Sequence, residues 1–406
     1  MREVEVFVQI DGVDVRAGTA YFSERRGAVS TTVTYDPQYQ ANSNAYAIDP
    51  ALPLTHGSSH TTSVPGAFSD CSPDRWGRRL IARAERAAAR AERRQPRTVN
   101  EIDFLLGISD TARQGALRFR DIGSAQYLSG GAEIPKLIEL PALLHAAREA
   151  DEPGQIRTLL QAGSSALGGA RPKAAVLIDD ELHTVKFPSR DDDWDVCAWE
   201  ATALELAERA KIDVPRSRLH RVDEHGVLCL RRFDRKGSRR IGFISAMTLL
   251  QARDGDHRDY IEIAEAVARV SNRADADLQE LWRRIAFSIA INNTDDHLRN
   301  HGLLRAGTSW QLSPVFDVNP NPDAVRERAT TIGWATPETE PASLMEIAPE
   351  FRVQPHIARR ILADVVEAVG TWRTVASKRG ISAAEIEMFE PTFAQQHALI
   401  SEVAAV

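Results

Sequence analysis

The chain has 406 residues, of which 43% are hydrophobic and 26% are charged, the balance of a globular protein with two or three domains. This composition excludes a chain that is mainly disordered. Fifty lysines and arginines against 57 aspartates and glutamates give a formal net charge of −7. That charge argues against a protein whose whole surface binds nucleic acid.

The cysteines and the apolar runs indicate the cellular compartment. Cys71, Cys197 and Cys229 are widely spaced and form no CxxC pair, so neither a disulfide framework nor a cysteine zinc site is predicted. The first residues alternate apolar and charged like a strand, and no run approaches the roughly 18 apolar residues of a membrane-spanning helix. We therefore expect a cytoplasmic protein with no membrane contact.

The first 70 residues predict short strands, and a helix follows. Asp11-Gly12 separates the alternating runs VEVFVQI and VDVRAGTAYF, which is a hairpin signal, and VSTTVTY continues the pattern. Ser72-Pro73-Asp74 then predicts the start of a long Ala/Arg helix, with Ser72 as its N-cap and Pro73 at its first position. We expect this helix to end before Pro96.

The predicted helix is strongly basic. Only Asp74, Glu85 and Glu92 offset its arginines, which are Arg75, Arg78, Arg79, Arg83, Arg86, Arg90, Arg93 and Arg94. One interpretation is a surface for an acidic partner or for nucleic acid. The other is a solvated helix face whose alanines, Leu80 and Ile81 pack inward.

The rest of the chain moves from mixed structure to helix. A helix is expected from Ile134 to about Ala150, followed by a Gly/Ser-rich stretch at 163–173, the strand AAVLI, a turn at 179–181 and the strand LHTVKF. A helix at about 194–210 and the strand-like GVLCLRRF come next. Beyond residue 235 the pattern is almost wholly helical, with amphipathic runs at 245–253, 259–271, 277–293, 355–369 and 383–404. We therefore expect an α+β chain with a join near residue 231.

The most informative segment is INNTDDHLRN at 291–300, directly after the apolar helix end RIAFSIAI. Asp295 and Asn300 are five residues apart, a spacing that lets one loop hold a carboxylate beside an incoming hydroxyl and an amide oxygen on a phosphate-bound metal. Asp317 follows between apolar residues, where a lone carboxylate is costly to bury unless a cation such as Mg²⁺ neutralises it. The alternative is plain turn chemistry of Asn and Asp.

Three upstream elements complete an ordered set. Lys186 lies in the strand LHTVKF and Glu200 on the following helix, the pair that orients the α- and β-phosphates of ATP in protein kinases. The loop at 163–169 has glycines that let its backbone N–H groups approach phosphate, although Gly169 stands where a Walker lysine would be. Singly, these are also typical of an exposed strand lysine and a flexible connection. Their order along the chain is that of a protein kinase.

In these segments the sequence resembles the HipA-type serine/threonine kinases, the toxins of bacterial toxin–antitoxin pairs. The resemblance covers most of the chain, and the pairing of TDDHLRN with FDV is its most diagnostic part. The matching stretches are SPDRWGRRL (72–80), LLGISDTARQGALRF (105–119), GGARPKA (168–174), VKFPS (185–189), RRFDR (231–235), NNTDDHLRNHGLL (292–304) and LSPVFDV (312–318).

The resemblance implies a role for each matching residue. Asp295 would be the catalytic base, Asn300 and Asp317 the Mg²⁺ ligands, and Lys186 the phosphate contact with Glu200 as its ion-pair partner. The remaining implied positions are the ATP-binding residues Gly168, Gly169, Ala170, Arg231 and Phe233, and the candidate autophosphorylation sites Ser164 and Ser165.

The resemblance also implies an architecture, cofactors and partners. We expect a protein-kinase-like two-lobed α+β fold: an N-terminal subdomain (1–125), a kinase N-lobe (126–230) and an all-helical C-lobe (231–406). The cofactors would be ATP and Mg²⁺. The partners would be a small helix-turn-helix antitoxin resembling HipB, operator DNA reached only through that antitoxin, and a translation-linked substrate such as an aminoacyl-tRNA synthetase.

Two other functions are weighed against the kinase. A metal hydrolase could use Asp295, His297, His301 and Asp317, but Leu298 replaces the glutamate of the HExxH pattern. A non-catalytic protein of kinase shape could act through its antitoxin alone, although all five catalytic positions are occupied.

Three neighbouring polar residues are assigned supporting roles. Asp296 is interpreted as loop scaffolding, because only Asp295 has the five-residue interval to Asn300. His297 is expected to orient the loop by hydrogen bonding. Asp234 is expected to pair with Arg235 or with the catalytic loop.

Overall fold

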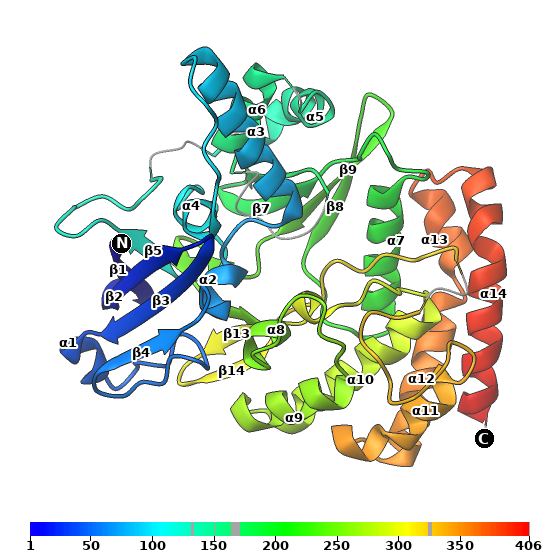
Figure 1. Cartoon of the computed structure of the whole chain (residues 1–406). Coiled ribbons are helices and arrows are strands. Elements are labelled where there is room, and N and C mark those ends of the chain that lie inside the picture. The colour runs from blue at the N-terminus through cyan, green and yellow to red at the C-terminus, as the bar shows by residue number, and fades with distance from the viewer. Residues whose placement is uncertain (131–133, 151, 164–170, 324–326, 406) are drawn as a thin grey trace. The chain divides into compact units, whose positions relative to one another are not determined.

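The computed structural model describes residues 1–130, 134–150, 152–163, 171–323 and 327–405 (Figure 1). The chain divides into two compact units. The first consists of Met1–Asp191, Arg221–His225 and Cys229–Ile244, and the second of Asp192–His220, Gly226–Leu228 and Ser245–Val406. The finer boundary expected at residue 125, inside the first unit, stays a prediction.

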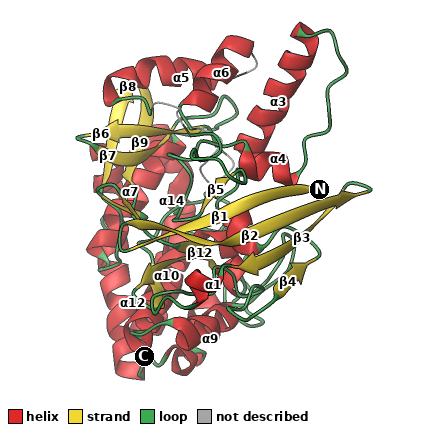
Figure 2. Ribbon diagram, turned by 90° about the vertical axis from the view of Figure 1, so that its left-hand side faces the viewer, coloured by secondary structure: helices red, strands yellow, loops and turns green. Residues whose placement is uncertain are grey.

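The first unit begins with an antiparallel sheet of order β4-β3-β2-β1-β5 (Figure 2). Its strands are β1 (Arg2–Ile10), β2 (Val13–Arg25), β3 (Ala28–Tyr35), β4 (Ser58–Thr61) and β5 (Arg118–Arg120), with the short helix α1 (Pro37–Gln40) after β3. Asp11 and Gly12 form the two-residue turn between β1 and β2 with φ of 51° and 84°. Positive φ at both turn positions matches the right-handed twist of the strands, and the predicted hairpin is confirmed.

Aromatic side chains cover this sheet. Phe68, on α2 (Gly66–Asp70), packs edge-on against Phe119 of β5 with ring centroids 5.1 Å apart, and lies 6.3 Å from the ring of Phe22 on β2. All three rings are buried. The central run of β1, residues 4–8, is buried as well, so the core of this part lies between the sheet and α2.

The basic helix forms, but its start differs from the expected one. Helix α3 runs over Arg75–Ala91, and Asp74 is its N-cap, with its carboxylate accepting a 2.8 Å hydrogen bond from the Gly77 N–H. Ser72 is not the cap, because its hydroxyl donates instead to the carbonyl of Phe68. A carboxylate at the N-cap also interacts favourably with the helix dipole, which favours Asp74 over serine here.

Other short helices accompany α3 in the first unit. They are α4 (Glu101–Leu106), the 3₁₀ turn η1 (Leu137–Glu139), α5 (Leu140–Arg148) and α6 (Pro153–Gln161), and α6 packs against both α3 and α5. No helix was predicted between the one expected to end near Ala150 and the Gly/Ser-rich stretch at 163–173, so α6 is an addition. Pro153 occupies the first turn of α6, where its missing N–H costs nothing.

A second sheet begins with β6 (Lys173–Ile178) and β7 (Glu181–Lys186), an antiparallel pair in which Lys173 lies opposite Lys186. Asp179 and Asp180 form its turn with φ of 50° and 61°, as the sequence predicted. The strands β8 (Ser217–Val222) and β9 (His225–Arg231) follow, and the division between the two units runs through this pair. The short strands β10 (Arg235–Lys236), β11 (Arg239–Arg240) and β12 (Phe243–Ser245) come next.

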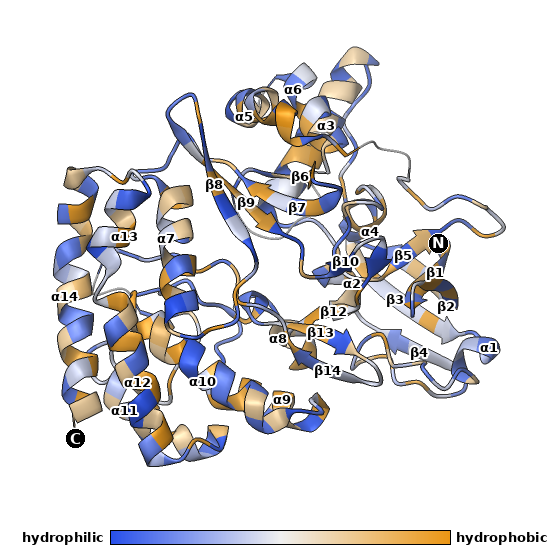
Figure 3. Cartoon of the chain, turned by 180° about the vertical axis from the view of Figure 1, so that it is seen from behind, coloured by the Kyte–Doolittle hydropathy of each residue, from blue (hydrophilic) through white to orange (hydrophobic). Residues whose placement is uncertain are grey.

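The second unit is mainly helical. Its helices are α7 (Val196–Arg209), α8 (Ala246–Leu249), α9 (Tyr260–Val270), α10 (Ala274–Ala290), α11 (Glu340–Glu346), α12 (Pro355–Val369), α13 (Trp372–Lys378) and α14 (Ala383–Ala405), with the 3₁₀ turns η3 (Leu298–Asn300) and η4 (Ala348–Phe351). Hydrophilic and hydrophobic bands alternate along α12 and α14 (Figure 3), as expected for amphipathic helices with one buried face.

Stacked aromatic rings join these helices. Trp199 of α7 stacks on Phe389 of α14 with ring centroids 3.9 Å apart, and Trp372 of α13 stacks on Phe393 of α14 at 4.4 Å. The indole N–H of Trp199 donates to Glu385 of α14, so its polar atom is satisfied as well. Among the described residues, no helix is long and apolar enough to cross a membrane.

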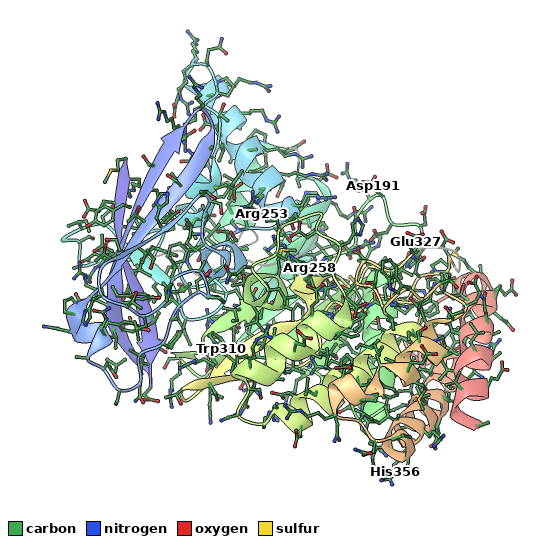
Figure 4. All side chains as sticks on the ribbon, turned by 60° about the horizontal axis from the view of Figure 1, so that its bottom comes forward. Asp191, Arg253, Arg258, Trp310, Glu327 and His356 are labelled. Atoms are coloured by element: carbon green, nitrogen blue, oxygen red, sulfur yellow. The ribbon has the colours of Figure 1, made fainter. Side chains whose placement is uncertain are left out.

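The helical unit also contains a hairpin of β13 (Gly302–Ala306) and β14 (Ser309–Leu312), with Trp310 on its second strand (Figure 4). The expectation of an all-helical lobe over residues 231–406 is therefore wrong, because β10, β11 and β12 lie in that range as well as this hairpin. The Ser313 N–H donates to the carbonyl of Gly302, so the hairpin brings the chain after Asn300 beside the chain before Asp317.

Candidate functional site

The candidate catalytic loop follows the end of α10. Asp295 is exposed, whereas Asn300, at the end of η3, is only 6% exposed. The Asn300 side-chain N–H donates a 3.1 Å hydrogen bond to the carbonyl of Asp295. With its nitrogen committed to the loop, the Asn300 amide presents its oxygen as a possible ligand. The predicted pair is thus joined within one loop.

Asp296 points into the protein and is fully partnered. Its Oδ2 accepts hydrogen bonds from the hydroxyls of Tyr260 at 2.6 Å and Ser288 at 3.1 Å, and its Oδ1 lies 3.1 Å from His301 Nε2. Burial alone would raise the pKa of Asp296, but His301 and the hydrogen bond from Tyr260 hold that pKa below its usual range. Asp296 therefore anchors the loop as an anion, and the interpretation of this residue as loop scaffolding is confirmed.

The imidazole that orients the loop is His301, not His297. Among the described residues, Nδ1 of His297 is buried with no hydrogen-bond partner. His301 faces Asp296 and packs edge-on against the ring of Tyr260, with centroids 5.6 Å apart. The expectation for His297 is therefore wrong. His301, five positions after Asp296, faces the carboxylate, and the adjacent His297 does not.

A buried arginine fixes the other side of the loop. Arg328, whose side chain is 3% exposed, donates from Nη1 to the carbonyl of Asn293 at 2.6 Å, and from Nε and Nη2 to the two carboxylate oxygens of Glu340 at 2.9 and 2.8 Å. The Thr330 hydroxyl donates to the carbonyl of Asp296 at 2.7 Å. Backbone positions of the loop are therefore fixed by side chains distant in sequence.

Asp317 lies on a segment that is tied to the same loop. The Asn292 amide donates to the carbonyls of Asn321 and Asp323, and the Asn321 amide donates to the Thr294 hydroxyl at 2.8 Å. Asp317 itself has φ of 59°. This left-handed conformation is sparsely populated outside glycine, although aspartate tolerates it better than most residues, and such positions concentrate at functional sites.

Glu200 is the fourth candidate residue of the second unit. It lies in α7 and is 2% exposed. Asp195 caps this helix by accepting from the Ala198 N–H at 2.9 Å, which fixes where the helix starts and therefore which face Glu200 occupies. Glu200 and the loop residues Asp295, Asn300 and Asp317 all belong to the helical unit.

Lys186 belongs to the first unit, at the end of β7. It is 8% exposed, so the alternative of an exposed strand lysine is wrong. Its cross-strand neighbour Lys173 is 1% exposed and pairs with Asp74, the α3 N-cap, at 2.9 Å. Lys173 was not identified from the sequence, because only the alternating strand around Lys186 drew attention there.

Arg231 and Phe233 also lie in the first unit, beside a buried ion cluster. Arg231 forms an ion pair with Glu181, and the ring of Phe233 lies 6.3 Å from that of Phe243. The next residue, Asp234, accepts from Arg232 and Arg235 at 2.5 and 2.7 Å, and from the Gly115 N–H at 2.7 Å.

The cluster settles the alternatives left open for Asp234. Its partners join the segment RRFDR to the segment TARQGALRF. Burial would raise the pKa of Asp234, but the two guanidinium groups and the Gly115 N–H hold that pKa below its usual range.

Part of the predicted site cannot be placed. Gly168, Gly169 and Ala170, and the candidate phosphorylation sites Ser164 and Ser165, lie outside the described residues. The described end of this segment is Gly163, with φ of 68°. A Cβ at Gly163 would lie 2.5 Å from that of Ala112, so both its conformation and its surroundings require glycine.

The residues that hold the candidate loop were mostly missed from sequence. Tyr260, Ser288, Arg328 and Thr330 lie up to 36 positions from Asp296, and nothing in their local patterns indicated a shared site. Among the described residues, no group of three or more His, Cys, Asp or Glu could hold a metal ion.

Comparisons with known proteins cover both units. A family model described as the HipA-like C-terminal domain matches residues 165–372, and one described as the HipA N-terminal domain matches residues 13–119. HipA of Shewanella oneidensis MR-1, solved with HipB and operator DNA, aligns with a TM-score of 0.68 at 14% identity over 99% of each chain. The Helicobacter pylori proinflammatory kinase CtkA aligns with a TM-score of 0.43 at 15% identity, over 59% of this chain and 92% of its own.

A search of curated proteins finds no sequence match. The likeness to the Shewanella protein extends over nearly the whole chain and confirms the predicted fold class, a two-lobed α+β fold. The C-terminal family model alone covers just over half of the 406 residues. The chain therefore belongs to the HipA family.

Proposed function

We propose that this chain is an ATP- and Mg²⁺-dependent serine/threonine protein kinase and the toxin of a pair resembling HipA and HipB. The observation that carries the proposal is that two adjacent aspartates lie in different environments. Asp296 is buried and anchored by Tyr260, Ser288 and His301, while its neighbour Asp295 is exposed on the same loop. A catalytic carboxylate needs this combination of access and fixed position.

The donor set suits Mg²⁺ better than a softer metal. Asn300 offers an amide oxygen and Asp317 a carboxylate, and hard oxygen ligands in small number are what Mg²⁺ takes alongside phosphate and water. Bound with the nucleotide, Mg²⁺ would offset the charge of the phosphate groups. Asn300 and Asp317 are the residues proposed to hold it.

The remaining roles are assigned to this chain's own groups. The Asp295 carboxylate would orient a serine or threonine hydroxyl and receive its proton. The buried ammonium group of Lys186 would contact phosphate oxygens, with Glu200 as its ion-pair partner, and the backbone around Arg231 and Phe233, with Gly168, Gly169 and Ala170, would contact the nucleotide. Ser164 and Ser165 are the proposed sites of self-phosphorylation.

The partnership follows from the relatives. The Shewanella protein was solved with HipB and its operator DNA. We propose that this chain likewise binds a small helix-turn-helix antitoxin and that its substrate is a translation-linked protein, such as an aminoacyl-tRNA synthetase, in the cytoplasm. A small helix-turn-helix protein encoded beside this gene and co-purifying with the chain would support the partnership, and failure to bind such a neighbour would contradict it.

The kinase proposal is tested with γ-labelled ATP and the Asp295→Ala variant. Wild-type protein should incorporate label on serine or threonine, found by mass spectrometry, only when Mg²⁺ is present. The variant should lose transfer by about 10²–10⁴-fold while it still binds nucleotide. The matched control is Asp275→Ala, an exposed carboxylate of the same unit whose one ion-pair partner among the described residues is Arg352, and its activity should not change. Equal labelling of the Asp295→Ala variant and the wild type would refute the assignment.

A further inference from the structure

The segment around α3 is strongly basic, and each of its acidic residues is already in an ion pair. Residues 74–103 contain nine arginines and five acidic residues, so this segment is positive within a chain of net charge −7. Each acidic residue is already engaged by another cation. Asp74 pairs with Lys173, Glu85 and Glu92 with Arg94, Glu101 with Arg78, and Asp103 with Arg97.

Five of the remaining arginines have no such partner in the described part of the chain. Arg75, Arg79, Arg86, Arg90 and Arg93 are all exposed, and among the described residues no carboxylate forms an ion pair with any of the five side chains. Arg83 is the exception within the helix, because it is half-buried and donates to the carbonyl of Ala150.

The unpartnered arginines lie in one row. At about 100° per residue, Arg75, Arg79, Arg86 and Arg90 fall within a wedge of about 60° on one side of α3. They span about 22 Å along its axis at about 1.5 Å per residue. Arg93 follows directly after the helix end. We call these five residues the arginine row. The buried Gly77 lies opposite the row, the buried Leu80 lies to one side of it, and α3 packs against α6.

The chemistry of the row favours a regularly charged polymer over a folded protein or a membrane. Protein interfaces are anchored by large apolar or aromatic side chains, and the exposed large hydrophobic residues among those described include none on α3. A membrane-binding helix needs a free apolar face, but that of α3 is used by α6. Guanidinium groups, by contrast, match phosphate oxygens in geometry and charge.

We propose that the arginine row binds the phosphate backbone of double-stranded DNA. The charge of the row does not distinguish DNA from RNA. The choice of DNA rests on the proposed partnership with an antitoxin that binds operator DNA. The chain would then contact the operator directly, rather than only through the antitoxin. Contacts to phosphate carry no sequence information, so the row would add affinity and orientation while the antitoxin reads the bases.

The test measures DNA binding by the full chain alone, without ATP. A fluorescent duplex of about 30 base pairs and arbitrary sequence is titrated with protein between about 50 and 200 mM salt. Five phosphate contacts, one for each arginine of the row, predict an affinity loss of about 10²–10³-fold over that salt range. At about 50 mM salt, the double variant Arg79→Ala/Arg86→Ala should bind DNA about tenfold more weakly than wild type. The slope of log K against log salt concentration should become shallower by about 1 for each arginine removed.

The control variant removes the same charge elsewhere. Arg359 and Arg360 are exposed arginines of α12 in the second unit, and Arg359→Ala/Arg360→Ala should leave DNA binding unchanged. Alanine preserves helix propensity in both variants, and circular dichroism checks that both fold. If both variants lose the same amount of DNA affinity, the effect is due to net charge and not to the arginine row, and the proposal is wrong.

Two further ligands separate the alternatives. If poly-glutamate binds as tightly as DNA, with the same loss in the α3 variant, the row is a site for an acidic protein and the proposal is wrong. If only an RNA duplex binds, the choice of DNA is wrong. No binding of wild-type protein to duplex DNA at low salt would also overturn it. None of these results depends on phosphoryl transfer, so they leave the kinase proposal to its own test.

Discussion

The hydroxyl of Tyr260, at the start of α9, donates a 2.6 Å hydrogen bond to the carboxylate of Asp296 in the loop after α10. Both side chains are buried. Burial, together with the neighbouring Asp296 charge, raises the pKa of Tyr260 well above its usual value, so the phenol stays protonated and remains a donor. Through this bond α9 fixes the residue next to the proposed catalytic base.

Removing that hydroxyl is expected to affect catalysis more than nucleotide binding. Tyr260→Phe leaves one buried oxygen of Asp296 short of a donor, at a cost of about 1–3 kcal/mol in the free energy of unfolding. Because Asp295 is adjacent, kcat for phosphoryl transfer should fall while the Kd for nucleotide stays nearly constant. Kinetics and calorimetry on the same preparation measure both.

The matched control for this change is Tyr127→Phe in the first unit. Its hydroxyl donates to Asp14 at 2.8 Å, so the same chemical group is lost at a carboxylate far along the chain from the loop. This variant should lose some stability but no kcat. A Tyr260→Phe protein with full kcat would show that Asp296 does not position the base.

The pair of Arg328 and Glu340 is predicted to be a large stabilising element of the helical unit. Arg328→Ala leaves Glu340, which is 7% exposed, with a buried charge and no guanidinium partner, and should lower the free energy of unfolding by about 3–5 kcal/mol. Arg352→Ala breaks an exposed pair with Asp275 and should cost less than about 1 kcal/mol. Urea denaturation measures both, and similar costs would contradict the account.

The buried cluster at Asp234 predicts a pH-dependent contribution to stability. Because the pKa of Asp234 lies below its ordinary value of 3.8, the unfolded chain takes up a proton in acid before the folded chain does. The stabilisation is therefore complete above about pH 5 and is lost as the pH falls below about 4. At neutral pH, Asp234→Asn should unfold more easily than wild type by about 3–5 kcal/mol.

The difference between wild type and Asp234→Asn should shrink as the pH is lowered from 5 toward 3. Thermal unfolding at a series of pH values measures this difference. Asp11→Asn serves as the control, since Asp11 is 75% exposed and pairs with Arg239 at the surface. A difference that stays constant in acid would mean that Asp234 is not held as a buried anion.

Much of the fold could be predicted from local patterns. The Asp11-Gly12 and Asp179-Asp180 turns, the strands around them and the long helices α9, α10, α12 and α14 all have clear periodicity or turn chemistry, and each is found. Short elements without such signals were missed, including α6, for which no helix was predicted. In that case tertiary packing against α3 and α5 decided the structure.

The sequence indicated the residues of the catalytic motif, but not the side chains that hold the loop in the folded protein. The interval between Asp295 and Asn300 correctly indicated one shared loop, and it separated Asp295 from Asp296. The supporting contacts of Tyr260, Arg328 and His301 depend on chain segments that meet only in the folded protein. A histidine adjacent to the motif, His297, therefore seemed the better candidate for orienting the loop, and that prediction was wrong.

The most direct test of the account is whether Mg²⁺ strengthens nucleotide binding through Asn300 and Asp317. Calorimetry with a non-hydrolysable ATP analogue, with and without Mg²⁺, compares wild type with the Asn300→Ala/Asp317→Asn double variant. The account predicts that Mg²⁺ tightens binding to wild type by at least about tenfold and leaves the variant unchanged. Equal enhancement by Mg²⁺ in both proteins would contradict it.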